Sequence, residues 1–133
     1  MINKIIAVDF DGTLCEDQYP EIGPAKYSVI DRLKAEQEAG AKIILWTCRT
    51  ERQLAEAVFW CTLRGLKFDA INENLKSSLE QYGNDTRKIY ATEYWDDRAI
   101  NPDNGDLEAE NLALKQRLEE LKKLLQEIAA GLT

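Results

Sequence analysis

The sequence contains no histidine, and this absence excludes several common catalytic arrangements at once. Ser-His-Asp and Cys-His triads, His-Glu-x-x-His zinc sites and histidine proton shuttles all need an imidazole. Any proton transfer must therefore use carboxylate, lysine or tyrosine side chains. Three cysteines, Cys15, Cys48 and Cys61, form no Cys-x-x-Cys pair, which argues against a disulfide framework and against a cysteine zinc site.

Long apolar runs are also absent, because no hydrophobic segment approaches the length that spans a bilayer. The short N-terminal run is interrupted by Asp9 and does not have the form of a signal peptide, so we expect a cytoplasmic protein without a membrane partner. Basic residues are the minority, since 17 Lys and Arg against 24 Asp and Glu give a net charge of −7. This balance argues against nucleic acid as a partner but is compatible with a phosphorylated substrate.

The stretch Ile5–Leu14 reads Ile-Ile-Ala-Val-Asp-Phe-Asp-Gly-Thr-Leu. Its short apolar run before a glycine predicts a buried parallel strand that ends in a tight turn. Asp9 and Asp11 then lie at the carboxyl end of this strand, where open α/β sheets bind ligands. Two carboxylates so close together resist joint ionisation, and a divalent cation with oxygen ligands is the natural stabilising group.

This Asp-x-Asp-Gly-Thr-Leu pattern resembles the first motif of the haloacid dehalogenase-like (HAD) hydrolase superfamily, most of whose members are Mg²⁺-dependent phosphatases. The resemblance implies that Asp9 attacks phosphorus and forms an aspartyl-phosphate. It also implies that Asp11 protonates the leaving group and then activates water. The alternative is an ordinary strand end whose Asp pair caps a turn.

The second and third motifs of that family have counterparts further along the chain. Thr47 follows the apolar segment 43–46 and matches the second motif, whose hydroxyl donates to a phosphate oxygen. The third motif is a lysine, for which we choose Lys88 and keep Lys76 as the alternative. A lysine in this role neutralises charge on Asp9 and on the transferring phosphoryl group.

The fourth motif is an acidic pair, matched by Asp96 and Asp97. By the resemblance, Mg²⁺ is bound by Asp9, the backbone carbonyl of Asp11 and Asp96, with Asp97 close by or acting through water. An acidic surface turn is the simpler interpretation of the pair.

Two arginines are further candidates for phosphate contact, because guanidinium matches phosphate geometry. Arg49 is preferred over Arg98 because it lies so close after Thr47 in the sequence. Simpler interpretations exist here as well: a threonine at a strand end is usually a cap, and a lysine is usually a solvated surface residue. Cys48 also lies beside the expected site, but no histidine exists to activate its thiol.

Apolar segments that suit strands alternate with amphipathic segments that suit helices, which predicts an α/β fold with a doubly wound parallel sheet and helices on both faces. Pro24 is expected to open a helix, and Thr50 with Gln53 is expected to form a capping box for the next one. The resemblance implies a HAD-like three-layer Rossmannoid domain. Residues 12–24 are too short to hold a cap domain, and residues 50–87 are used up by one expected helix, one strand and one further helix, so we expect a capless protein.

The composition changes after about residue 105, which divides the chain into an expected HAD-like catalytic domain at 1–105 and an amphipathic helix at 106–133. Residues of the second part recur at alternating spacings of four and three, the signature of a coiled coil. This heptad seam comprises Leu107, Asn111, Leu114, Leu118, Leu121, Leu125, Ile128 and Leu132.

The seam predicts a homo-oligomer that forms through the Leu107–Leu132 helix. Asn111 falls at an a position, which favours two parallel strands, and lysines such as Lys115 fall at e positions. Leu112 and Leu124 widen the apolar stripe and would suit a higher oligomer. The alternative is a single helix packed back onto its own sheet.

Together these features predict a Mg²⁺-dependent phosphomonoester hydrolase that works through an aspartyl-phosphate on a small or larger phosphorylated substrate. One alternative is a phosphotransferase or mutase of the same superfamily. Another is a catalytically idle oligomeric scaffold whose working part is the helix.

Overall fold

Four short strands form a parallel sheet in the N-terminal part of the chain. They are β1 (Ile5–Val8), β4 (Lys42–Leu45), β5 (Ala70–Ile71) and β6 (Glu93–Trp95), in the spatial order β5-β4-β1-β6. The structure is a computed structural model of the chain and describes residues 3–102 and 107–132. The predicted α/β class with a parallel sheet is confirmed.

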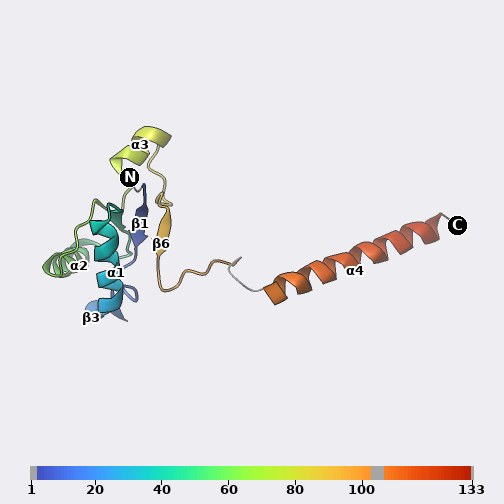
Figure 1. Cartoon of the computed structure of the whole chain (residues 1–133), viewed down its shortest axis with the longest axis horizontal. Coiled ribbons are helices and arrows are strands. Elements are labelled where there is room, and N and C mark those ends of the chain that lie inside the picture. The colour runs from blue at the N-terminus through green and yellow to red at the C-terminus, as the bar shows by residue number, and fades with distance from the viewer. Residues whose placement is uncertain (1–2, 103–106, 133) are drawn as a thin grey trace. The chain divides into compact units, whose positions relative to one another are not determined.

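Helices and one hairpin connect these strands (Figure 1). Strands β2 (Cys15–Gln18) and β3 (Glu21–Ala25) pair antiparallel in the segment between β1 and α1. The helices are α1 (Tyr27–Glu38), α2 (Glu51–Leu63) and α3 (Lys76–Tyr82), each of which precedes the next strand of the sheet. Within residues 3–102 the β2–β3 hairpin is the element that lies between β1 and α1.

The two faces of the sheet are buried in different clusters, because side chains alternate along a strand. One face carries Ile6, Val8, Ile43 and Leu45, which are fully buried against residues of α1 and α2. The other face carries Ala7 and Ile44, which pack in a second cluster with Ala70, Leu75 and Ile89. Both faces of the central strands are therefore covered, which explains why β1 and β4 read as continuous apolar runs.

Two expected helix starts differ from those observed. Pro24 lies in β3 and α1 begins only at Tyr27, because a two-stranded hairpin tolerates the missing N–H of proline at its edge. Thr50 does precede α2, but its side chain makes no capping hydrogen bond, so the expected capping box with Gln53 is not formed.

The chain divides into two units, residues 1–99 and residues 100–133, whereas the sequence predicts a boundary after residue 105. The second unit contains α4 (Leu107–Gly131), a helix of 25 residues. Residues 106 and 133 of the expected helical range lie outside the described residues. None of the helices in the described ranges has both the length and the apolar character that crossing a membrane requires.

Candidate functional site

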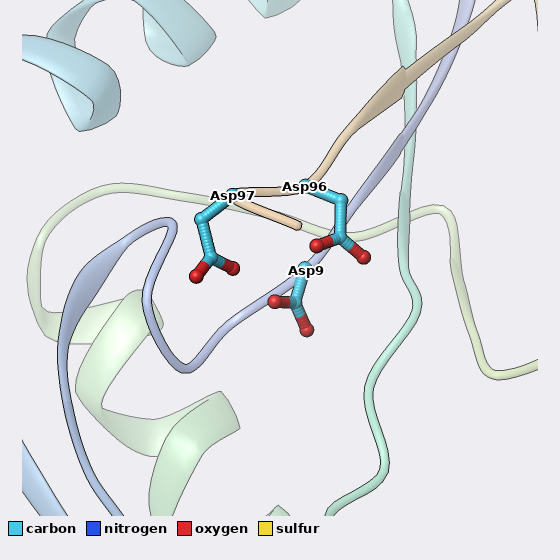
Figure 2. Close-up of side chains that lie close together, drawn as sticks. All are labelled: Asp9, Asp96 and Asp97. Carbon is cyan, nitrogen blue, oxygen red and sulfur yellow. The ribbon is translucent and has the colours of Figure 1, made fainter. Parts of the chain in front are cut away.

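Three carboxylates converge at the edge of the sheet where β1 and β6 end (Figure 2). Asp9 directly follows β1, and Asp96 and Asp97 directly follow β6. Because these strands are parallel neighbours, their carboxyl ends meet at one edge, and the Asp9 amide donates to the Trp95 carbonyl at 2.9 Å. One carboxylate oxygen from each of the three aspartates lies within 4.8 Å of the others.

Thr13 connects the ends of β1 and β6 through contacts of its hydroxyl group with Asp9 and Asp97. Its Oγ1 accepts a hydrogen bond from the Asp97 amide at 3.0 Å, and it lies 3.3 Å from Asp97 Oδ1 and 3.5 Å from Asp9 Oδ2. The Lys26 ammonium donates to the Gly12 carbonyl at 2.6 Å in the same turn. Thr13 and Lys26 are not among the site residues that the sequence predicts. Thr13 belongs to the Asp-x-Asp-Gly-Thr-Leu motif, and this membership is the signal that points to it.

The electrostatics of this cluster are unfavourable as it stands. Burial is the main cause that raises the pKa of Asp9 from 3.8 to about 6, and the negative charges of Asp96 and Asp97 raise it further. A backbone hydrogen bond from Phe10 opposes this shift. Three oxygen donors at this spacing suit a hard divalent cation, whose charge would relieve the repulsion. The residues present therefore fit a divalent cation, and Asp9, Asp96 and Asp97 are the residues that would hold it.

The raised pKa of Asp9 predicts that its ionised carboxylate lowers the free energy of unfolding of the metal-free protein, by an amount that depends on pH. The Asp9 carboxyl keeps its proton up to about pH 6 in the folded state but releases it near pH 4 in the unfolded chain. The loss of stability therefore develops as the pH rises from about 4 to about 6, and it persists at higher pH. Asp9→Asn should therefore raise the free energy of unfolding at pH 8 by about 1–2 kcal/mol after solvent screening, and hardly at all at pH 3.5. Urea unfolding in chelator measures this difference. The exposed Asp31→Asn is the matched control, and a gain independent of pH would contradict the assignment.

Gly12 makes the approach of Asp97 possible. Its φ of +90° favours glycine, and a Cβ at this position would lie 2.4 Å from Asp97 Oδ2. An alanine would force the exposed Asp97 carboxylate out of the cluster.

We therefore expect Gly12→Ala to weaken Mg²⁺ binding by about tenfold or more, because one of three donors is displaced. The left-handed backbone adds a loss of about 1–2 kcal/mol in the free energy of unfolding. Calorimetric titration with Mg²⁺ measures the first effect. Gly40→Ala is the control, since its φ is +104° but no atom lies within 4 Å of the added Cβ. Equal Mg²⁺ affinity in both variants would show that the contact with Asp97 is unimportant.

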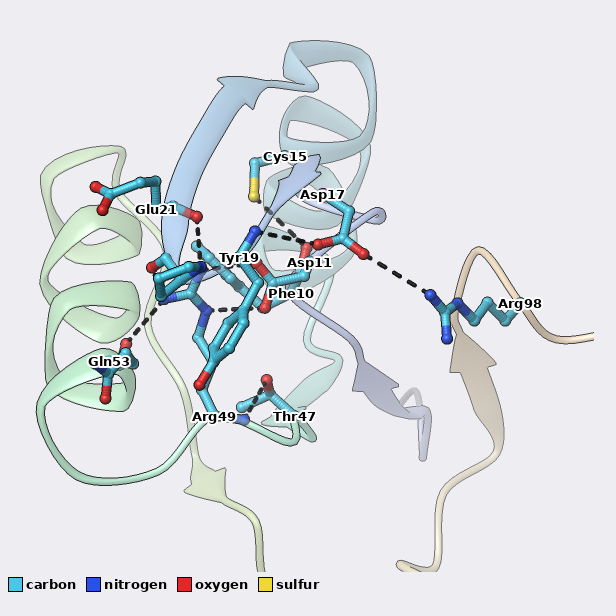
Figure 3. Close-up of polar contacts among 11 residues, drawn as sticks. Phe10, Asp11, Cys15, Asp17, Tyr19, Glu21, Thr47, Arg49, Gln53 and Arg98 are labelled. Atoms are coloured by element: carbon cyan, nitrogen blue, oxygen red, sulfur yellow. Dashed lines mark hydrogen bonds and ion pairs between the residues drawn. The ribbon is translucent and has the colours of Figure 1, made fainter.

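Asp11 does not join the carboxylate cluster; its side chain pairs with Arg49 (Figure 3). The Arg49 Nε and Nη2 atoms donate to the two Asp11 carboxylate oxygens, each at 2.8 Å. Arg49 is 1% exposed, and hydrogen bonding to Asp11 raises the pKa of its guanidinium. Arg49 lines the hollow beside Asp9, but its N–H groups are bound within the protein, so its contact with a substrate phosphate stays a prediction.

A hollow of about 470 Å³ opens beside the cluster and includes Asp9, Asp11, Thr47 and Asp96 in its lining. The Thr47 hydroxyl accepts the Arg49 amide at 3.1 Å, an arrangement that leaves its own proton to donate into the hollow. Arg98 also lines the hollow, where its guanidinium lies 3.8 Å from a carboxylate oxygen of Asp17 in an exposed ion pair.

The structure does not bring either candidate lysine into contact with Asp9. Lys88 lines a different hollow, with its Nζ 5.8 Å from the centroid of the Tyr94 ring. Lys76 begins α3 and is exposed. The sequence supplied residue type and order for this choice, but the path of the loop before β6 decides where Lys88 lies.

The chain matches no family model and no curated protein sequence. It is similar to a solved structure described as a conserved protein coded by a locus of Bacteroides thetaiotaomicron, with 39% sequence identity and a TM-score of 0.66. The similarity covers 77% of this chain and 84% of the Bacteroides chain. At this identity and coverage, the chain belongs to the same family as this conserved protein from Bacteroides thetaiotaomicron.

Proposed function

We propose that this protein is a Mg²⁺-dependent phosphomonoester hydrolase of the HAD type that works through an aspartyl-phosphate. The observation that carries the proposal is the convergence of the Asp9, Asp96 and Asp97 carboxylates at one edge of the sheet. The cluster brings together Asp9 of the first motif and Asp96 of the fourth motif, which are 87 residues apart in the sequence. An incidental surface acidic turn would not explain the half-buried Asp9 with its raised pKa.

We also propose that the sheet belongs to a three-layer, doubly wound HAD-like domain. In support, the chain moves from β1 outward to β4 and β5 and then crosses to β6 on the other side of β1. The direction of winding thus reverses beside β1, and ligands of open α/β sheets bind outside the carboxyl ends at such a point. Asp9 and Asp96 lie on the two strands that border it.

The cation, when bound, neutralises the carboxylates and orients the phosphate. In the first step one Asp9 carboxylate oxygen bonds to phosphorus while the bond between phosphorus and the ester oxygen breaks, and Asp11 gives a proton to that oxygen. Both Asp11 oxygens accept hydrogen bonds from Arg49 in the structure, so Asp11 has to leave this pair and take up a proton before this step. In the second step Asp11 takes a proton from water, whose oxygen bonds to phosphorus and releases inorganic phosphate and free Asp9. Thr47 donates its hydroxyl proton to a non-bridging phosphate oxygen.

The candidates for the positive group that accompanies the cation at the phosphate are Lys88, Lys76 and Arg98. Arg98 is favoured by its position, since it lines the same hollow as Asp9 and its partner Asp17 is exposed. A surface ion pair of this kind is weak and exchanges readily for a phosphate. Asp17 and Tyr19 of the β2–β3 hairpin segment line this hollow, which suits phosphorylated substrates of small or larger size.

A panel of phosphomonoesters with Mg²⁺ tests the proposal, with chelator as the metal-free control. Hydrolysis that depends on Mg²⁺ and on Asp9 supports it. Phosphoryl transfer only in the presence of an acceptor sugar phosphate would instead identify a phosphotransferase or mutase that uses the same aspartyl-phosphate. No turnover on any phosphate would leave the oligomeric scaffold as the function.

A second proposal concerns α4, which we infer to associate with α4 of a second copy as a parallel coiled coil. The seam residues Leu114, Leu118, Leu121, Leu125, Ile128 and Leu132 are between 52% and 83% exposed in the single chain. An apolar stripe of this length on a 25-residue helix needs a partner, because an isolated helix is marginal in water.

Charges beside the seam support a second copy in parallel register. Glu110 falls at a g position and faces Lys115, at an e position, of the other helix. Arg117, at a g position, would face Lys122, at an e position, and this pair of like charges opposes the register. Glu119 offsets part of the repulsion, because it pairs with Lys122 within the same helix at 3.7 Å. Asn111 at an a position meets its own copy and favours two strands in this register.

We propose a cytoplasmic location on the basis of the cysteines. Cys15, Cys48 and Cys61 are all free thiols in the structure, and Cys48 is exposed. Free exposed thiols suit a reducing compartment.

A further inference from the structure

A second hollow, of about 670 Å³, lies between α3, the segment 84–91 and β6. Its volume falls in the range of about 300–1,000 Å³ that is typical of small-molecule sites. Its aromatic wall is formed by the side chains of Tyr82, Tyr90 and Tyr94. The Tyr82 and Tyr90 rings are 54% and 43% exposed, and their centroids lie 5.2 Å apart. Exposed rings along a hollow offer faces and edges against which a planar ligand can stack.

This aromatic hollow is held in shape by Asn74, which is 4% exposed. The Asn74 side-chain oxygen accepts the Tyr90 amide at 2.7 Å, and its side-chain nitrogen donates to Asp85 Oδ1 at 2.8 Å. The Tyr94 hydroxyl donates to the Ile89 carbonyl, which joins β6 to the same segment. Because buried polar groups with satisfied hydrogen bonds fix the backbone around them, the hollow is formed before any ligand enters.

The charge of the aromatic hollow is positive. Of the described residues that line it, Lys88 is charged and none is acidic. The Lys88 Nζ lies 5.8 Å from the centroid of the Tyr94 ring, and it takes part in none of the ion pairs found within residues 3–102. An ammonium group without a carboxylate partner, beside several rings, favours a ligand that is both planar and negatively charged.

A further ring contact links the aromatic hollow to the carboxylate cluster. The Trp46 and Tyr94 rings lie 5.8 Å apart between centroids, and they come from the ends of strands on opposite sides of β1. Tyr94 pairs with Ala7 of β1, and Asp9 follows Ala7 by two residues, so side-chain alternation places Asp9 on the same face. Thr47, directly after Trp46, lines the hollow of Asp9. The pair of rings therefore connects the two hollows.

We propose that the aromatic hollow binds the leaving-group part of the substrate, and that this part is a planar aromatic ring with a negative group of its own. The inference rests on the proposed function, which places the reacting phosphate at Asp9. Tyr82 and Tyr90 stack against the ring, and the Lys88 ammonium binds the negative group. Lys88 is then occupied away from the phosphate, which leaves Arg98 as the positive group beside Asp9.

Calorimetric titration of the full chain with 2-naphthoate in chelator tests the hollow without reference to activity. The chelator removes metal ions, so the carboxylate of the probe cannot bind through a cation at Asp9. We expect 2-naphthoate to bind at least about tenfold more tightly than 2-naphthamide, which has the ring without the charge. It should exceed cyclohexanecarboxylate, which has the charge without the aromatic ring, by a similar factor of about ten. Equal affinity for the three probes, or no binding of 2-naphthoate at about 10 mM, would overturn the proposal.

Two substitutions assign the binding to this hollow. Lys88→Gln should weaken 2-naphthoate about tenfold and leave 2-naphthamide unchanged, whereas Tyr90→Leu should weaken both about tenfold. Tyr82→Leu gives the same test as Tyr90→Leu from α3 and serves if the first variant does not fold. Lys67→Gln and Tyr27→Leu are the matched controls, since both residues are exposed and neither lines the hollow. Equal losses in the control variants would refute the assignment to this hollow.

Hydrolysis in the presence of Mg²⁺ tests whether the occupant of the hollow is part of the substrate. The phosphate ester of 6-hydroxy-2-naphthoate should have a KM at least about tenfold below that of phenyl phosphate. Tyr90→Leu should remove this difference by raising the KM of the naphthoate ester, with kcat within about twofold of the wild-type value. Equal KM values for the two esters in the wild-type protein would show that the hollow does not hold the leaving group. A Tyr90→Leu variant that lowers kcat for both esters alike would show that the ring has a structural role only.

Binding and hydrolysis separate this inference from the proposed function. A wild-type protein that binds 2-naphthoate in the hollow but hydrolyses no phosphate would refute the proposed function and the leaving-group role, while the hollow would remain a site for planar anions. Mg²⁺-dependent hydrolysis without binding of any of the three probes would support the proposed function and refute this inference.

Discussion

Asp9→Asn should abolish Mg²⁺-dependent phosphate hydrolysis, with a loss of at least about 10⁴-fold in kcat. The amide keeps the shape of the side chain but is not a nucleophile, and it weakens the cation site where the three carboxylates lie within 4.8 Å. Loss of a single proton-transfer group costs less, typically about 10²–10⁴-fold, so Asp11→Asn should retain more activity. Initial rates with an aryl phosphate measure both variants.

Asp31→Asn is the matched control for this experiment, because Asp31 is exposed on α1 and distant in sequence from every motif. It should keep the wild-type rate when purified in the same way. An Asp9→Asn protein with more than about one per cent of wild-type activity would show that no aspartyl-phosphate forms on this residue. A phosphate substrate would then have to react through another group.

Leu121→Glu should convert the self-associated protein to a monomer, with association at least about 10³-fold weaker. Leu121 is at a d position of the seam and is 56% exposed on the single helix. Each copy in a parallel pair would lose a buried leucine and place a carboxylate against its own copy. The freed helix should also lose ellipticity, since isolated helices of this length are marginal.

Leu112→Glu is the control for the helix, because Leu112 carries the same side chain at a b position outside the seam and is 57% exposed. Sedimentation equilibrium should show the wild-type mass for this variant and half that mass for Leu121→Glu. Dissociation by both substitutions would point to a higher oligomer with a wider contact. A monomeric wild-type protein at about 100 μM would refute self-association through α4.

The helical and strand segments were predictable because their signals are local. The apolar runs that became β1 and β4 are short and bounded by turn residues, and the heptad spacing of α4 is visible without a structure. Pro24 was misassigned because proline at a hairpin edge and proline at a helix start share the same fixed φ, and only the pairing of β3 with β2 distinguishes them.

By itself the sequence determined which residue types stand at the ends of the strands, and hence that Asp9 and Asp96 would meet if those strands were neighbours. Only the tertiary structure decided that β6 pairs with β1 and that Lys88 lies beside Tyr94, in a hollow other than that of Asp9. It also decided that Arg49 binds Asp11 and the hairpin. The physical reason is that strand propensity depends on neighbours in the chain, whereas the direction of a long charged side chain depends on which acceptors the fold brings within about 3 Å of it.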